Sequence, residues 1–255
     1  MANTLLIGLS RQSALRRELD IVANNIANMN TNGYKADGAV FSEHIMPRAR
    51  ADRFSGPDAR LSFVHDRASW MDLSQGPRDV TRNPLDVSID GDAFLVIETP
   101  KGERYTRNGA LQLNAAGELV TSAGHRVLGE AGPIVFNADD KGIEINPNGV
   151  VRVREGAQSD SDGERGRLRL VRFETPQSLV KDGTSSFAAP ADILPQPTPN
   201  SRIVQGTIEK SNVRPVVEMT RMMELTRAYT SVADILSKHS ELRRGAIQKL
   251  AEVPA

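Results

Sequence analysis

The sequence predicts an α+β protein in which N- and C-terminal helices pack as a coiled coil, with an inserted, mostly antiparallel β domain. Three observations support this fold class. Residues 5–37 and 213–250 carry apolar residues at alternating steps of four and three, the a/d spacing of a coiled coil. Residues 71–208 contain many short β-type runs separated by glycine-containing turns. Residues 37–70 have little periodicity and are predicted to connect the two parts.

Composition limits the possible classes of function. The 255 residues allow one large domain or two modest ones. Lys plus Arg total 32 and Asp plus Glu total 32, so a formal charge of zero gives no electrostatic case for nucleic acid or an anionic membrane. Cysteine is absent, which excludes disulfides and thiolate chemistry.

Targeting signals are also missing from the sequence. No run approaches the roughly 20 apolar residues of a membrane span. Residues 4–9 are apolar but lack the basic n-region and the small-residue cleavage site of a Sec signal peptide. The composition therefore predicts a protein that does not span a membrane and that stays in the cytoplasm, unless a route that needs no cleaved signal exports it.

Residues 1–36 are predicted to form the N-terminal helix of the coiled-coil domain. Asn24, Asn25 and Asn28 lie inside this predicted helix although asparagine is a poor helix former, so we expect their amides to bond another chain. The helical pattern ends at residues 30–33, where asparagine and glycine favour a turn. The predicted seam consists of Leu15, Leu19, Val22, Ile26 and Met29.

Residues 37–70 are predicted to form a largely extended connector. Pro47, Gly56 and Pro57 interrupt the segment, and one short strand is expected at residues 61–64. Phe41 and Ile45 are four residues apart, so they belong either to one helical turn or to an exposed recognition pair.

Residues 71–208 are predicted to form a β-rich outer domain. Residues 85–89 alternate apolar and polar side chains, and residues 94–97 form an uninterrupted apolar run that is typical of a buried strand. The close spacing of the runs favours an antiparallel barrel or sandwich. Further strands are expected at residues 105–106, 111–113, 119–121, 133–136, 143–145, 150–153 and 168–173.

Residues 209–255 are predicted to form the C-terminal helix of the coiled-coil domain. Asn212 is expected to cap it, and Pro215 falls in the first turn, where its missing N–H costs little. If the two terminal helices run antiparallel, the polar breaks in their seams, Gln12 and His239, should lie near one another. The predicted seam consists of Met222, Leu225, Tyr229, Val232 and Leu236.

The sequence contains no catalytic constellation. Its four histidines are scattered, and no two are three or four residues apart. A nucleophile elbow, a P-loop and a dinucleotide fingerprint are all missing. We therefore expect no catalytic residues, no metal, no cofactor and no small-molecule substrate.

Three stretches resemble the flagellar rod and hook axial proteins of bacteria. They are residues 22–35, residues 83–121 and residues 209–229, in the family's order. The opening residues 5–12, the length and the short approach to Asn83 are most similar to proximal-rod members of the family. Distal-rod members are the nearest alternative, and they usually have a longer segment before the β domain.

The resemblance implies a structural subunit of the basal-body rod that serves motility and is not an enzyme. Family members pack their terminal helices as an inner tube with the β domain outside. The implied partners are other rod proteins, copies of the same chain and the flagellar type III export apparatus. The implied location is the rod that crosses the periplasm, reached without a cleaved signal. The seam residues and the three asparagines then become candidate subunit-interface residues, and Phe41 and Ile45 resemble the family's short export motif.

Two other functions remain open on the residues alone. One is a β-barrel ligand-binding or enzymatic module with a helical oligomerisation stalk, and the other is a coiled-coil adaptor between other proteins. A small oligomer of defined size would favour the first of these. An open helical polymer would favour the rod subunit.

Overall fold

The computed structural model describes residues 2–46, 61–155, 162–198 and 201–251 of a chain that folds as two compact units. The chain has a helix near each end and a mostly antiparallel β domain between them, which confirms the predicted α+β class. Unit 1 comprises Met1–Ala27, Asp37–Met71 and Arg214–Ala255, and unit 2 comprises Asn28–Ala36 and Asp72–Val213.

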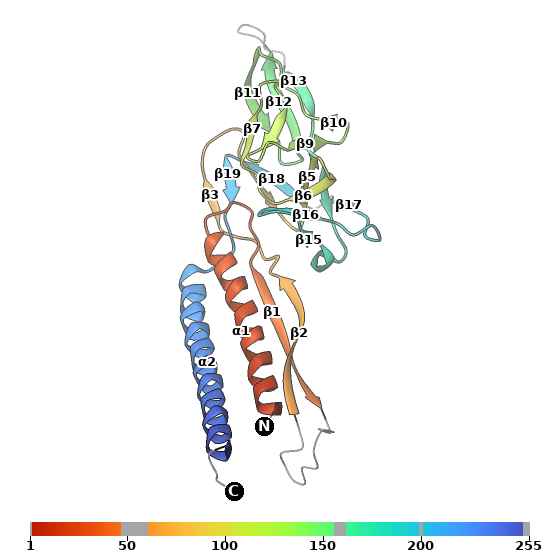
Figure 1. Cartoon of the computed structure of the whole chain (residues 1–255). Helices are drawn as coiled ribbons and strands as arrows, with labels where there is room; N and C mark the ends of the chain where they lie inside the picture. Colours follow the sequence, from red (N-terminus) through yellow and green to blue (C-terminus); the bar gives the residue numbers. More distant parts are fainter. Residues whose placement is uncertain (1, 47–60, 156–161, 199–200, 252–255) are drawn as a thin grey trace. The chain divides into compact units, whose positions relative to one another are not determined.

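Unit 1 consists of two long helices and one β-hairpin (Figure 1). Helix α1 spans Ala2–Ala27 and helix α2 spans Pro215–Ala251. Strand β1, Asp37–Met46, pairs antiparallel with β2, Leu61–Met71. Helix α1 contacts α2 and both strands of the hairpin.

The two helices run antiparallel. Gly8 lies against Leu236, since a Cβ built on Gly8 would lie 2.6 Å from Leu236 Cδ2. Further along α1, Glu18 Oε1 accepts a hydrogen bond of 3.0 Å from Arg221 Nε. Residue numbers therefore rise along one helix as they fall along the other.

Helix α1 ends at Ala27, earlier than the sequence predicts. Thr31 N donates to Asn28 O over 3.1 Å, and Thr31 Oγ1 donates to Asn28 Oδ1 over 3.2 Å. These two bonds close a turn directly after the helix. Asn28 and Met29 therefore follow the helix, and residues 28–36 belong to unit 2 and not to the helical part.

The expected connector is a paired hairpin. Strands β1 and β2 pair from Asp37 with Met71 to Met46 with Leu61, with a bulge between Val40 and Phe41. The strand expected at residues 61–64 is the beginning of the longer β2. Backbone pairing with β1 supplies order that the side-chain pattern alone does not indicate. Pro47, Gly56 and Pro57 lie outside the described residues.

Unit 2 contains seventeen described strands, all paired antiparallel, and one short 3₁₀-helix. The largest sheet has ten strands, with β5 at its centre pairing with β6, β9 and β14. Strands β11, β12 and β13 form a second sheet, and the pairs β18–β4 and β19–β3 form two small ones. The elements are β3 Arg78–Val80, β4 Val87–Asp90, β5 Phe94–Thr99, β6 Gly102–Thr106, β7 Leu111–Leu113, β8 Leu119–Thr121, β9 Arg126–Gly129, β10 Gly132–Pro133, β11 Asp140–Ile145, β12 Val150–Glu155, β13 Asp162–Arg167, β14 Leu170–Arg172, η2 Pro176–Ser178, β15 Val180–Lys181, β16 Ser186–Ala188, β17 Gln196–Pro197, β18 Arg202–Gln205 and β19 Thr207–Glu209.

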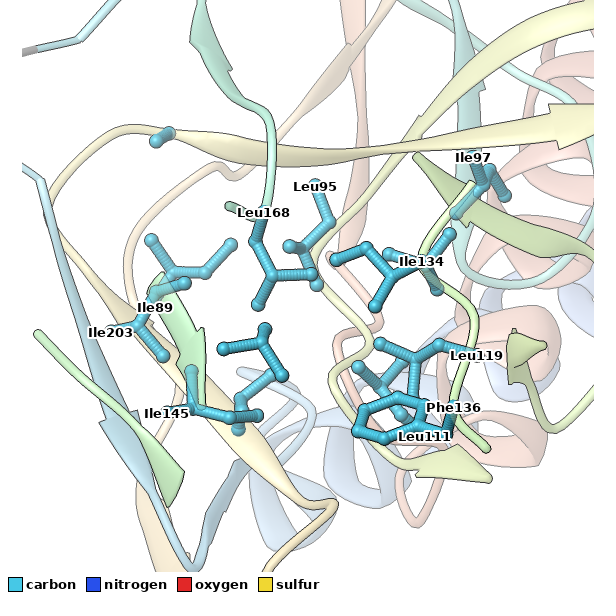
Figure 2. Packing of buried hydrophobic residues seen from close by; sticks show 14 of the residues in the cluster. Ile89, Leu95, Ile97, Leu111, Leu119, Ile134, Phe136, Ile145, Leu168 and Ile203 are labelled. Atoms are coloured by element: carbon cyan, nitrogen blue, oxygen red, sulfur yellow. The ribbon is translucent and has the colours of Figure 1, made fainter. Parts of the chain in front are cut away.

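One apolar core holds these sheets together (Figure 2). The run that was predicted to be a buried strand forms β5, and Leu95 is fully buried there with Val96. Burying a side chain of this size stabilises the fold by about 1.5–3 kcal/mol. The core residues labelled in the figure are Ile89, Leu95, Ile97, Leu111, Leu119, Ile134, Phe136, Ile145, Leu168 and Ile203.

Neither described helix contains an 18-residue window that is apolar enough to cross a membrane.

Candidate functional site

A buried cluster of three charged side chains lies in unit 2. Lys35 is 1% exposed, Arg107 is 3% exposed and Glu209 is 1% exposed. Lys35 lies in the segment 28–36, Arg107 follows β6, and Glu209 is the last residue of β19. Three parts of the sequence that are far apart therefore each place one charge at the same point.

Glu209 holds the two cations unequally. Lys35 Nζ donates to Glu209 Oε1 over 2.6 Å and to the carbonyl oxygen of Ser74 over 2.7 Å. The backbone N–H of Gly76 also donates to Oε1, over 3.1 Å. Arg107 Nη1 lies 3.5 Å from Glu209 Oε2, which makes an ion pair without a hydrogen bond. The carboxylate is thus bonded to Lys35 and only approached by Arg107.

Burial sets the electrostatics of the cluster. Removal from water lowers the pKa of Lys35 below its ordinary value, and the nearby Glu209 carboxylate opposes that shift. Burial likewise lowers the pKa of Arg107, again opposed by Glu209. Among the described residues, Arg107 Nε and Nη1 and Glu209 Oε2 find no hydrogen-bond partner. Two buried cations share one buried carboxylate, and Asp72 and Asp92 also favour the charged forms of Lys35 and Arg107.

Backbone contacts fix the segment that carries Lys35. The N–H of Gly33 donates to the carbonyl oxygen of Glu209 over 2.8 Å. Gly33 has a φ of +67°, and a Cβ there would lie 2.4 Å from the backbone nitrogen of Asn108. Only glycine meets both requirements, because other residues rarely adopt positive φ and would collide with the loop. Lys181 adds a bond of 2.6 Å from Nζ to the carbonyl oxygen of Lys35.

Asn212 ties three segments together instead of capping α2. Its Oδ1 accepts from Ala36 N over 2.8 Å, and its Nδ2 donates to the carbonyl oxygen of Asp72 over 2.8 Å. Asp72 N in turn donates to Ala36 O over 2.8 Å. Helix α2 begins three residues later at Pro215, as the missing N–H of proline predicts. The amide of Asn212 is therefore bonded inside unit 2.

The buried charged cluster and the hydrogen bonds of Asn212 together form a junction whose groups hold separate segments of the chain together. Its ammonium, carboxylate and amide groups are hydrogen-bonded to one another or to backbone, and its guanidinium is ion-paired with the carboxylate. The part of the chain that the structure describes has no group of three or more His, Asp or Glu side chains placed to hold a metal ion. The arrangement can hold residues 28–36, 72–76 and 209–213 together.

The predicted seam residues lie in or next to unit 1, and the helix pair covers them to different degrees. Val22 is 1% exposed and Leu225 is 8% exposed, so these two are core positions of the helix pair. Met222 is 38% exposed. The half-buried positions are Leu15, Leu19, Ile26, Met29, Tyr229, Val232 and Leu236.

The three asparagines have different environments. Asn25 is 1% exposed, and its side-chain amide makes two hydrogen bonds with the backbone of Asp37. Oδ1 accepts from Asp37 N and Nδ2 donates to Asp37 O, each over 2.9 Å. Both polar groups of Asn25 are therefore bonded within the chain, where the sequence led us to expect a bond to another chain. Asn24 is exposed, and Asn28 is half-buried.

Two smaller expectations concern unit 1. His239 shares a cavity of about 430 Å³ with Arg11, one residue away from the Gln12 that was expected to lie near it. Phe41 and Ile45 lie on strand β1, so their backbone is extended and not a helical turn. Their side chains lie outside the described part.

Sequence reasoning assigned no role to Lys35, Arg107 or Glu209. Each lies within one of the three stretches that carry the family resemblance. Lys35 is the one charged residue of its stretch, whereas Arg107 and Glu209 lie among several other charged residues. Nothing local to any of the three indicates that it is buried.

Three family models match the chain. Residues 5–35 match the model described as "Flagella basal body rod protein". Residues 88–153 match "Flagellar hook protein FlgE/F/G D1 domain", and residues 204–249 match "Flagellar basal body rod FlgEFG protein C-terminal". Each match includes one charged residue of the buried cluster: Lys35, Arg107 and Glu209 respectively.

Curated relatives match along nearly the whole chain. The flagellar basal-body rod protein FlgF of Caulobacter vibrioides is 40% identical, covering 99% of this chain and 100% of that protein. FlgF of Mesorhizobium japonicum is 33% identical, covering 98% of each. FlgG of Bacillus subtilis is 28% identical, covering 95% of this chain and 97% of that protein. The chain belongs to the family of flagellar basal-body rod proteins and, within it, is more similar to these FlgF proteins than to that FlgG.

Proposed function

We propose that this chain is a structural, non-enzymatic subunit of the proximal rod of the bacterial flagellum. It polymerises through its terminal helices, with copies of itself and with other rod proteins, into a hollow shaft. Membership of the rod family supports the structural role, and higher identity to FlgF supports the proximal position.

The observation that carries the polymerisation model is the apolar surface of α2. Eight of the fifteen large apolar side chains that are exposed among the described residues lie on this one helix. Large contiguous apolar surface on a water-soluble subunit typically marks an interface. The eight are Val216, Val217, Met219, Met222, Met223, Ile235, Leu242 and Ile247.

Three of these side chains form an apolar face on α2 that is separate from the side carrying the buried Leu225. Val216, Met219 and Met223 follow steps of three and four, so they share one face of the helix. Met223 is 55% exposed, whereas Leu225, two residues on, is 8% exposed. Residues two apart on a helix point in different directions. Helix α2 can therefore bind a neighbour while it remains packed on α1.

Contacts of this kind lead to a polymer. A helix that meets α1 on one face and a different surface of the next subunit on another makes a heterologous contact, which generates an open helical assembly. We propose coiled-coil packing for both sets of contacts. The half-buried seam residues and the exposed Asn24 would be covered by neighbouring subunits, and methionine adapts well to such surfaces.

Charged substitutions on the exposed face test the model. Met223→Lys is expected to abolish rod assembly and motility, because it places an ammonium group in the proposed interface. Glu224→Lys places the same side chain at an exposed position of the same helix, about 100° round the helix from Met223 and so outside the Val216, Met219 and Met223 face, and serves as the control. Complementation of a strain that lacks the gene, with electron microscopy of basal bodies, gives the readout. Rods of normal length in both strains would refute the model.

Asn25 tests the role of the hairpin attachment. Asn25→Ala removes two hydrogen bonds to Asp37, so it is expected to loosen the start of β1 and to impair assembly while unit 2 stays folded. Hydrogen exchange of unit 2 amides and a motility assay measure the two effects separately. Normal motility in this variant would count against the proposal.

We further propose that the chain leaves the cell through the flagellar type III apparatus and that Phe41 and Ile45 contribute to its recognition there. A double alanine substitution at these positions is expected to reduce export into the culture medium in a strain without a hook. Glu43→Ala, between them, is the matched control. Equal export of both variants would contradict this assignment.

A further inference from the structure

A small polar cavity of about 170 Å³ in unit 2 is lined by two hairpin turns. One turn joins β8 to β9, and the other joins β15 to β16. Backbone hydrogen bonds close both turns, from Thr121 N to His125 O over 2.8 Å and from Asp182 N to Ser186 O over 2.9 Å. The turns keep their shape without a guest, so the cavity is preformed, as ligand sites usually are.

The buried part of the lining combines an apolar side chain with an unpaired donor. Ile97 is 2% exposed and Asn108 is 8% exposed. Asn108 Oδ1 accepts from Ala110 N over 3.0 Å, whereas Asn108 Nδ2 has no hydrogen-bond partner in the described part of the chain. This Nδ2 atom is not fully enclosed, so a group inside the cavity can reach it. A guest that brings an acceptor satisfies a donor that is costly to leave unpaired.

The outer part of the lining offers hydroxyls and no free charge. Ser122 and Thr184 are exposed, and neither hydroxyl has a hydrogen-bond partner among the described residues. Asp182 is the one carboxylate of the described lining, and its oxygens accept from Lys101 Nζ over 3.0 Å and Arg104 Nε over 2.8 Å. No Lys or Arg belongs to this described lining. A neutral guest therefore suits the cavity better than an ion.

An acetamido group, CH₃–CO–NH–, matches this arrangement. Its methyl group can pack on Ile97 while its carbonyl oxygen accepts from Asn108 Nδ2, and its N–H then points back to the hydroxyls. A water molecule takes up roughly 30 Å³ in the liquid, so a cavity of about 170 Å³ has room for such a group.

The hydroxyls at the entrance narrow the choice of molecule that carries the acetamido group. Ser122 and Thr184 can each donate or accept, and so can the half-buried ring of His125, which has no partner among the described residues. The hydroxyls of a sugar ring can bond to these groups. An alkyl chain offers them nothing, so a sugar is the better carrier.

We propose that this cavity binds the acetamido group of an N-acetylated amino sugar, whose ring lies against the hydroxyls at the entrance. This inference goes beyond the proposed function as a rod subunit. It does not depend on that function, because every residue that forms the site belongs to unit 2.

Three small probes test the chemistry on the full-length chain, with NMR signals of the Asn108 side-chain amide and the Ile97 methyl groups as the readout. Methyl N-acetylglucosaminide carries the proposed group, methyl glucoside has a hydroxyl in its place, and N-butylacetamide carries the acetamido group on an alkyl chain. We expect saturable shifts with the first probe and binding weaker by about tenfold or more with each of the others, because each lacks part of the hydrogen bonding.

Each probe can contradict the proposal. No saturable shift with methyl N-acetylglucosaminide would mean that water alone fills the cavity and would overturn the proposal. Methyl glucoside that binds as tightly would overturn the role of the acetamido group. N-butylacetamide that binds as tightly would overturn a sugar as the carrier.

Variants locate the bound group. Asn108→Asp keeps Oδ1 for Ala110 N but replaces the donor Nδ2 by an oxygen, so it is expected to abolish binding of the acetylated sugar. Ala123→Leu enlarges an exposed side chain of the lining and should block entry, whereas Ala115→Leu, at an exposed turn position outside the lining, is the matched control. Methyl signals of the core residue Leu95 show whether each variant is folded. Unchanged binding in Ala123→Leu, or an equal loss in Ala115→Leu, would overturn the proposed site.

Discussion

Replacing Glu209 should destabilise unit 2 more than replacing Lys35, although the two form one ion pair. Lys35→Met leaves Glu209 opposite Arg107, so one buried cation still faces one buried anion. Glu209→Gln leaves two buried cations without a carboxylate. Removing one member of a buried ion pair typically costs about 3–5 kcal/mol, because the other charge stays buried and unpaired. Comparing the unfolding free energy lost in Lys35→Met with that lost in Glu209→Gln therefore shows whether one carboxylate balances two buried cations.

We expect the destabilisation of the two variants to lie at opposite ends of this range of about 3–5 kcal/mol. Lys35→Met also removes the donor to the carbonyl oxygen of Ser74, worth about 1 kcal/mol, but keeps a balanced pair, so we expect a loss of about 3 kcal/mol. Glu209→Gln keeps an oxygen for Gly76 N but removes the carboxylate that both buried cations face, so we expect about 5 kcal/mol. Losses of this size are a large fraction of the typical total of about 5–15 kcal/mol.

Native-state hydrogen exchange of β5 and β9 amides in the full-length chain measures the unfolding free energy of unit 2 specifically. Glu103→Gln is the matched control, since its pair with Arg169 spans 2.9 Å but is exposed on both sides. Exposed pairs are worth about 0–1 kcal/mol. A Glu209→Gln loss no larger than that of the control, or a Lys35→Met loss larger than that of Glu209→Gln, would refute the reasoning.

Two further predictions concern unit 2. Gly33→Ala should lower the melting temperature more than Gly124→Ala: both sites have positive φ, but a Cβ at Gly33 would lie 2.4 Å from Asn108 N, whereas one at Gly124 meets nothing within 4 Å. Equal shifts in thermal denaturation would contradict this. Hydrogen bonds from Arg165 lower the pKa of Asp140, so its contribution is present above the unfolded-state pKa and is lost as the pH falls through the folded-state pKa. Asp140→Asn should flatten the acid limb of the stability curve, and an unchanged limb would argue against that ion pair.

Local pattern was enough to predict the elements whose order comes from their own residues. Pro215 begins α2 because it needs no hydrogen-bond acceptor in the first turn. The short β-branched and apolar stretches at β5, β8 and β12 are strands with buried apolar side chains, as their length and composition predict.

Elements that depend on pairing could not be predicted in this way. Arg126–Gly129 is a short run that begins with a charged residue, and Asp162–Arg167 carries four charged residues. Both are strands because β5 and β12 offer them backbone partners. The buried charged cluster could not be predicted from the sequence for a related reason. Lys35 and Glu209 are 174 positions apart, and a lysine next to a tyrosine after a glycine turn looks like solvated surface until the fold is known.

That separation of 174 positions has a consequence for the order in which the protein folds. In a chain that is threaded through a narrow channel with its N-terminus first, Lys35 emerges long before its carboxylate partner. The hydrogen bonds from Gly33 N to Glu209 O and from Ala36 N to Asn212 Oδ1 also cannot form before the later residues emerge. Contacts between residues so far apart in sequence form slowly, because the chain loses the entropy of loop closure before the contact stabilises it. If the chain is exported as proposed above, these contacts can form only when passage of the chain is nearly complete, and an incomplete chain stays loose enough to continue moving.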